Sequence, residues 1–234
     1  MAASDAFAGR LTNALAFANQ VLRGQLNTGS PAAFGRLPLK LLGCVGICGL
    51  GYGTVMGSFG GIGTEHTWQM LYSAAKVPLL LLGTFVLCLP SFFVFNTVAG
   101  LRQDFREAAG ALISAQAGMT IVLCALAPFT AVWYLSVSNY SAAVLFNGLV
   151  FGGASLTTTA ILRRNYRRLI ERNSRHRLLL RTWSVLYIFV GIQLGWVLRP
   201  FVGHPGTAVQ WFRPDAWGNA YLAVLHHMSG LISP

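Results

Sequence analysis

The sequence predicts an all-α protein, a polytopic bundle of about five membrane-spanning helices with an amphipathic helix before it and an interfacial helix after it. The first observation is composition, because 54% of the residues are hydrophobic and only 10% are charged. A soluble domain carries about 25% charged residues, and a chain with so few would expose large apolar patches to water. The second observation is a series of apolar segments near the roughly 20 residues that a helix needs to cross a bilayer.

Residues 1–37 form the first predicted region, an amphipathic helix followed by a linker in the cytoplasm. Between residues 4 and 23, apolar side chains recur at the spacings of one helix face, three and four residues apart: Phe7, Leu11, Leu15, Ala18 and Leu22. Two placements are open for this helix, the membrane interface and the surface of the bundle. No cleavable signal peptide is expected, because no basic start is followed by an uninterrupted apolar core.

The predicted transmembrane bundle covers residues 38–198. Its spans are 38–62, 77–100, 109–135, 141–162 and 182–198. Pro90 and Pro128 fall inside the second and third spans, where the missing backbone donor should kink each helix or end it early. Lys40 and Lys76 are placed at the ends of spans, from which their charged groups can reach the interface.

Arginine sets the predicted orientation. The segment 163–181 carries eight arginines and one acid, Glu171, and loops rich in Lys and Arg stay in the cytoplasm. The N-terminus is then cytoplasmic, and the segments 63–76 and 136–140 form outer loops. The tail 199–234 is extracytoplasmic, and the predicted location is a cytoplasmic (inner) membrane crossed several times.

The tail is predicted to contain one more helix, over about 217–231. This helix is too short to span a membrane, and two histidines and Gly230 interrupt its apolar pattern. We expect it to lie in the interface or to dock on the bundle, and a re-entrant arrangement is the open alternative.

Glycine repeats every fourth residue in the first span, and this pattern is the sharpest signal in the sequence. The residues are Gly49, Gly53, Gly57 and Gly61. In lipid, small residues let helix backbones approach closely, whereas each glycine costs about 1 kcal/mol relative to alanine inside a helix. Two uses are open, tight packing within one chain and a subunit interface in a homo-oligomer or with other membrane subunits.

The basic segment 163–181 is the second candidate site, and we expect it to form a helical extension bent back on the membrane. Anionic lipid headgroups attract such clusters by about 1 kcal/mol per charge; an acidic partner protein and a purely topological role are the alternatives. Nucleic acid is not expected, because no aromatic platform or binding motif accompanies the charges. The residues of this candidate contact are Arg163, Arg164, Arg167, Arg168, Arg172 and Arg175.

No enzyme chemistry is predicted. The six acidic residues lie outside the centres of the spans, whereas ion-coupled transport usually places a carboxylate at membrane depth. No nucleophile motif, zinc motif or phosphate loop occurs, and Cys44 and Cys48 lack a further metal ligand at suitable spacing. Neither a cofactor nor a metal is expected. Four polar residues should form hydrogen bonds between helices: Asn96, Gln116, Asn147 and Gln193.

A motif follows the last span and predicts a fixed turn that joins the tail to the bundle. Its residues are Trp196, Arg199, Pro200, Gly203 and Arg213. Tryptophan suits the membrane interface, and proline and glycine suit a turn. Arg199 should emerge where its charge reaches lipid headgroups or the carboxylate of Asp215, and with Arg213 it should tie the tail to the bundle.

Two stretches carry a resemblance to known proteins. The first runs from Lys76 through Pro90 to Asn96, and the second is GWVLRPFVGHP over residues 195–205, followed by Phe212 and Arg213. They resemble a family of bacterial polytopic inner-membrane proteins with a GWxLRPFxGxP motif after the last span. The resemblance implies a bacterial inner-membrane protein and implies no activity or substrate.

Two functions follow from these features as expectations. The first is a non-catalytic integral membrane subunit that anchors or assembles a larger membrane complex through close helix packing. The alternative is an oligomeric pore or uncoupled transporter with the glycine-rich first span near its axis.

Overall fold

The computed structural model describes residues 2–26, 37–59, 61, 64–203, 209–213 and 217–218. In this part of the chain every long element is an α-helix. A short 3-10 turn, η2 (Arg102–Asp104), precedes the fourth helix. The helices are α1 (Ala2–Leu22), α2 (Leu37–Gly57), α3 (Thr64–Val98), α4 (Phe105–Ser136), α5 (Tyr140–Arg172) and α6 (Arg175–Val197).

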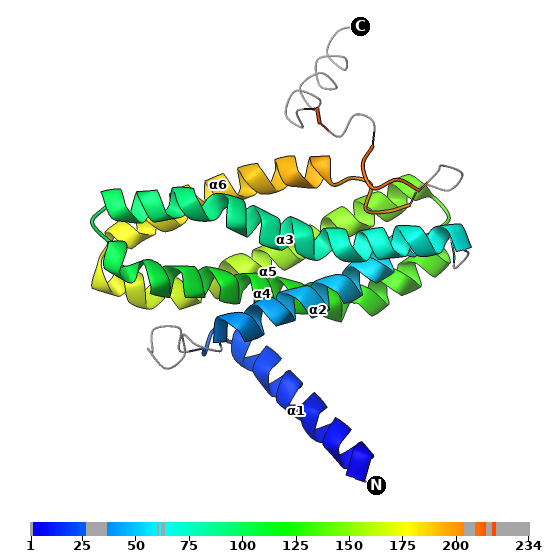
Figure 1. Ribbon diagram of the computed structural model, residues 1–234, viewed down its shortest axis with the longest axis horizontal. Helices are drawn as coiled ribbons and strands as arrows, with labels where there is room; N and C mark the ends of the chain where they lie inside the picture. Colours follow the sequence, from blue (N-terminus) through cyan, green and yellow to red (C-terminus); the bar gives the residue numbers. More distant parts are fainter. Residues whose placement is uncertain are drawn as a thin grey trace, which may run out of the picture.

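Five helices, α2 to α6, lie alongside one another in an elongated bundle (Figure 1). The main contacts link them in the order α6, α3, α2, α4, α5. The ring is nearly open between α5 and α6, which touch each other less than any other neighbours in this order. We call the end where α6 stops and α5 begins the Arg199 end, and the opposite end the Arg172 end.

The surface and interior of the bundle have the polarity expected in lipid. All five bundle helices are long and apolar enough to cross a membrane. Large apolar side chains point outward, such as Ile47, which is 75% exposed, and Leu135, which is 89% exposed. Polar side chains such as Thr120 and Asn147 are buried. The chain is therefore a multi-pass α-helical membrane protein, as its composition predicts.

The third helix differs from its predicted bounds. Residues 64–76 form the first turns of α3, so the prediction of an outer loop over 63–76 is wrong for these residues. The cause is the hydropathy pattern, which detects only the apolar part of a helix. The polar residues Gln69, Ser73 and Lys76 continue the same helix and are buried, because they contact the segment after α6.

Prolines inside the helices do not end them. The structure continues α3 through Pro78 and Pro90, and α4 through Pro128, so of the two effects predicted for Pro90 and Pro128 the early end does not occur. In membrane bundles, neighbouring groups and local adjustments satisfy the backbone carbonyl that a proline leaves without its donor.

The arginine-rich segment is helical almost throughout. The fifth helix continues to Arg172, and only Asn173 and Ser174 separate it from α6. With 33 residues, α5 is about 50 Å long, which exceeds the roughly 30 Å of a hydrocarbon core. Its last turns therefore extend the helix beyond a membrane and carry the arginines there.

The first helix leaves the bundle at an angle (Figure 1). Its C-terminal part packs on the bundle through the buried Val21 and the partly buried Phe17, whereas Leu11 and Leu15 are exposed. Most of the predicted linker and almost all of the predicted helix over 217–231 lie outside the described residues.

Candidate functional site

The glycines of α2 are used within the chain. Gly49, Gly53 and Gly57 are buried against α3. A Cβ atom on Gly57 would lie 2.7 Å from the Cα atom of Met70, and one on Gly49 would lie 3.3 Å from the Cβ atom of Pro78. The distance at Gly57 leaves no room for a side chain and the distance at Gly49 leaves little, so the glycine face makes the α2–α3 contact.

Gly61 does not belong to this face. The second helix ends at Gly57, and Gly61 has a φ of +111° with nothing within 4 Å of its Cβ position. The predicted groove of four glycines is therefore a contact made by three, and Gly61 instead takes a backbone conformation that favours glycine.

The six arginines of the predicted contact lie at the Arg172 end and divide into two groups. Arg172 pairs with Asp104 at 2.8 Å and Glu107 at 3.2 Å, and Arg175 donates to the carbonyl of Ala99 at 3.2 Å. These two arginines join the α5–α6 turn to the preceding turn between α3 and α4. The other group is exposed on the outer side of α5: Arg163, Arg164, Arg167 and Arg168.

Three polar side chains of α3 hold the turn that follows α6 at the Arg199 end. Lys76 Nζ donates to the carbonyl of Pro200 at 2.8 Å, and Gln69 Nε2 donates to that of Phe201 at 3.2 Å. The hydroxyl of Ser73 donates to the same carbonyl of Phe201. Lys76 is fully buried in the middle of a helix, so its predicted place at a helix end is wrong.

Sequence reasoning missed this face of α3, although a signal was present. Gln69, Ser73 and Lys76 are four and three residues apart, which places them on one side of a helix. Gly203 packs against the same face, because a Cβ atom there would lie 2.9 Å from Cγ of Gln69. The peptide bond between Arg199 and Pro200 is cis.

Two arginines meet over one tryptophan beside this turn. The guanidinium carbon of Arg199 lies 3.4 Å from the ring centre of Trp196, and that of Arg213 lies 5.7 Å from it. Burial lowers the pKa of Arg199 below its usual value, and the positive charge of Arg213 acts in the same direction. The structure thus brings three residues of the predicted tail motif together.

The two guanidinium groups are incompletely paired. Within the described residues, Nε and Nη2 of Arg199 and Nε of Arg213 are buried and have no hydrogen-bond acceptor. None of the salt bridges among the described residues involves Arg199 or Arg213. The predicted partner of Arg199, Asp215, lies outside the described residues.

A cavity of about 610 Å³ adjoins these arginines. Its wall combines Arg199 and Arg213 with the first three turns of α5, including Tyr140 and Asn147, and with apolar side chains such as Leu80. We call it the arginine cavity. A molecule that fills this cavity would contact two positive charges and several apolar side chains.

Asn147 is fixed in this wall by its neighbours. Its Oδ1 accepts from Tyr52 of α2 at 2.9 Å, and its Nδ2 donates to Tyr134 of α4 and to the carbonyl of Ala143. The prediction of hydrogen bonds between helices is confirmed for Asn147. The other three residues differ from one another.

Asn96 donates within its own helix, to the carbonyl of Phe92. Gln193 donates to the carbonyl of Gly218 at 3.2 Å. The side chain of Gln116 hydrogen-bonds with Tyr187 of α6, and its Oε1 is buried without a donor among the described residues. Gln116 also lines a second cavity.

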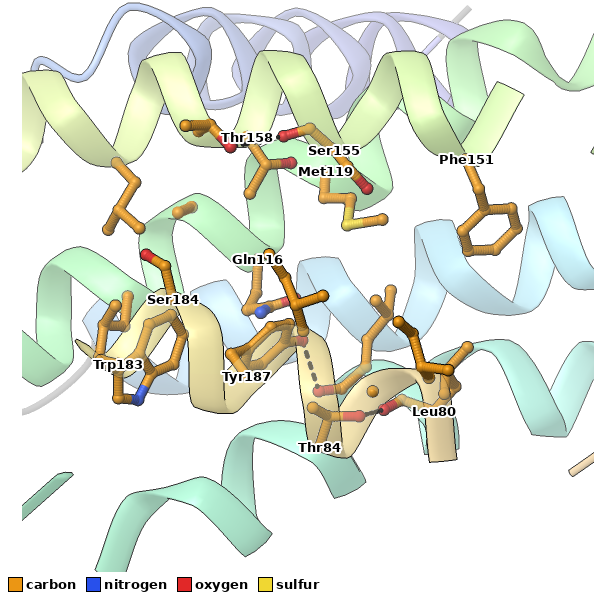
Figure 2. Close-up of a pocket in the computed structure, with 18 residues that line it drawn as sticks. Leu80, Thr84, Gln116, Met119, Phe151, Ser155, Thr158, Trp183, Ser184 and Tyr187 are labelled. Carbon is orange, nitrogen blue, oxygen red and sulfur yellow. Dashed lines mark hydrogen bonds between the residues drawn. The ribbon is translucent and has the colours of Figure 1, made fainter. Parts of the chain in front are cut away.

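This second cavity has a volume of about 340 Å³ and lies between α3, α4, α5 and α6 (Figure 2). We call it the lateral crevice, because it occupies the nearly open side of the ring. Its wall is mainly apolar, with polar groups from Thr84, Gln116, Ser155 and Ser184. Leu80 and Phe151 line both the lateral crevice and the arginine cavity.

The cysteines offer no further centre in the described residues. The sulfur atoms of Cys44 and Cys48 are 4.0 Å apart, and all four cysteines are free thiols. Among the described residues, no group of three or more His, Cys, Asp or Glu side chains is placed to hold a metal ion.

Comparison of this chain with family models, with curated proteins and with solved structures gives no match.

Proposed function

We propose that this membrane protein is a non-catalytic binding subunit that holds an anionic molecule in the arginine cavity. The observation that carries the proposal is the pair of guanidinium groups, which line a cavity while three of their buried nitrogens have no acceptor in the described residues. Buried charges are normally paired and hydrogen-bonded. An anion supplies both the opposite charge and the missing acceptors.

The chemistry of arginine favours a phosphate or carboxylate group. The planar guanidinium offers several N–H donors in a fork that matches either group. The ring of Trp196 stabilises Arg199 by about 0.5–2 kcal/mol, but a ring face offers no acceptor in the guanidinium plane. The volume of about 610 Å³ lies within the range of about 300–1,000 Å³ typical of ligand pockets.

Inorganic phosphate tests this proposal on the full chain, purified without lipid in a neutral detergent. At constant ionic strength, phosphate should raise the melting temperature of the wild type. Arg199→Gln and Arg213→Gln should each weaken phosphate binding by about tenfold or more, because a lost charged hydrogen bond costs about 1.5–3 kcal/mol.

Arg177→Gln is the matched control, because Arg177 is exposed at the other end of the bundle. Its phosphate-induced shift should equal that of the wild type. If all three variants respond like the wild type, the arginine cavity is not an anion site.

Assembly into a larger membrane complex is a second candidate function, supported by two exposed glycines, of which Gly148 also lines the arginine cavity. Gly148 and Gly152 are four residues apart on α5, and nothing lies within 4 Å of either Cβ position. Such a pair lets a second helix approach closely in lipid. The glycine face of α2 is covered by α3, so it is not available to line the axis of an oligomeric pore.

Native mass spectrometry in mild detergent tests assembly. Gly152→Leu, at a glycine that lines neither cavity, should remove any bound partner or second copy. Leu149→Met, a change at an exposed residue of the same helix that lines neither cavity, should retain it. If both variants associate equally, this surface of α5 does not mediate assembly.

A further inference from the structure

We propose that the anion is the headgroup of a membrane phospholipid, and that an acyl chain of the same molecule lies in the lateral crevice between α5 and α6. This inference rests on the proposed anion site and adds the identity of its ligand. It uses three properties of the cavities: their adjacency, the opening of the lateral crevice and their difference in polarity.

The two cavities are neighbours inside the ring. Leu80 of α3 and Phe151 of α5 line both of them, and Figure 2 shows these two residues at one end of the lateral crevice. A molecule bound at Arg199 and Arg213 therefore needs to pass only this pair to enter the crevice.

The lateral crevice opens toward the surrounding lipid. Ser155 and Thr159 of α5 line it and are exposed, as are Ile188 and Ile192 of α6. The sixth helix packs mainly on α3 and contacts α5 sparsely. In a membrane, this mouth lies beside acyl chains, so a lipid can enter from the side without crossing water.

The polarity of the combined space changes along its length. One end holds two arginines with three nitrogens that have no acceptor among the described residues, and the other is walled largely by apolar side chains such as Leu112 and Met119. A small anion would fill only the charged end. A phospholipid with an anionic headgroup has a charged end and an apolar end joined in one molecule, and so fits both.

Photolabelling of the wild type tests the position of the chain directly. The probe is phosphatidic acid with a diazirine in the middle of one acyl chain, incorporated with the full protein into phosphatidylcholine vesicles. Adducts are expected on Met119 and Gln116, which line the crevice and are only 7% and 4% exposed. Bulk lipid does not reach these residues, so labelling there requires a chain inside.

Variants then separate the headgroup from the chain. Ser155→Trp fills the mouth of the crevice, and its control is Leu156→Trp, since Leu156 is 76% exposed and does not line the crevice. Native mass spectrometry should show several-fold less bound phosphatidic acid for Ser155→Trp and an unchanged amount for Leu156→Trp. Arg199→Gln should reduce both the bound lipid and the Met119 adduct.

Three results would overturn the inference, and they differ in what they leave intact. If Ser155→Trp retains phosphatidic acid and the crevice stays unlabelled while phosphate binding still depends on Arg199 and Arg213, the site binds a soluble anion and the proposed function stands. If neither phosphate nor phosphatidic acid depends on these arginines, both proposals fail. Equal crevice labelling by a diazirine phosphatidylcholine would also overturn the choice of an anionic lipid.

Discussion

At the scale of single residues, Lys76 is stabilised inside the bundle by a backbone oxygen and an aromatic ring. Its ammonium group donates to the carbonyl of Pro200 at 2.8 Å and lies 5.4 Å from the ring centre of Trp211. Both partners belong to the segment after α6, so the charge of one α3 side chain holds that segment in place. The apolar stem of a lysine packs well in such a position.

Replacing this lysine by an apolar residue of similar length should loosen the tail. Lys76→Met removes the donor and leaves the carbonyl of Pro200 without its partner, which should cost about 1–3 kcal/mol of folding stability. The melting temperature of the full chain in neutral detergent measures the effect. Lys40→Met is the control, because Lys40 is exposed at the start of α2. Equal melting temperatures for the two variants would contradict the assigned role.

At the scale of helices, the contact between α2 and α3 depends on missing side chains. The carbonyl oxygen of Gln69 and the Cα atom of Met70 lie 2.8 Å and 2.7 Å from the Cβ position of Gly57. These neighbours are backbone atoms and cannot move without shifting the whole helix. The close approach gives the van der Waals contact that holds helices together in lipid.

Alanine substitutions should therefore have opposite effects at two glycines of α2. Gly57→Ala forces the helices apart and should destabilise the protein by about 1–3 kcal/mol. Gly43→Ala adds a methyl group to open space and should be neutral or stabilising by up to about 1 kcal/mol, from helix propensity. Thermal unfolding of both variants is the measurement, and a greater loss at Gly43 would refute the assignment of the contact.

Helix existence follows from the sequence more readily than helix bounds do. A span must be apolar over about 20 residues, so hydropathy locates all five spans. The first turns of α3 and the last turns of α5 lie beyond that requirement and are polar. Their helical form is fixed by contacts distant in sequence, such as Lys76 with Pro200 and Arg172 with Asp104.

The candidate site is predictable only in part for the same reason. Trp196 and Arg199 are three residues apart, so a local motif indicates their proximity. Other residues that complete the wall of the arginine cavity, such as Tyr140 and Asn147, belong to α5. No local pattern joins that helix to the tail, and the contact appears only when the ring of helices is assembled.

At the scale of the whole molecule, charge is distributed unevenly between the two ends. All eight arginines of the segment 163–181 are exposed, and this segment forms the Arg172 end. Positive charge near the ends of spans is retained in the cytoplasm. We therefore infer that the Arg172 end is cytoplasmic and that the arginine cavity lies toward the opposite face.

Accessibility of single cysteines tests this orientation. Ser174→Cys and Ser138→Cys place a thiol in exposed turns at the Arg172 and Arg199 ends, in a background where the four native cysteines are replaced by alanine. In intact cells, a membrane-impermeant maleimide should label position 138 at once and position 174 only after permeabilisation. The reverse pattern would invert the orientation, and the cysteine-free background should remain unlabelled.

The two-residue turn between α5 and α6 holds these helices close together at the Arg172 end. Asn173 and Ser174 fix their separation there, and the ion pairs of Arg172 with Asp104 and Glu107 stabilise the turn. At the other end of α6, about 35 Å away, Lys76, Gln69 and Ser73 attach the following turn to α3. The sparse contact between α5 and α6 is therefore the part of the ring that can widen most without breaking either attachment.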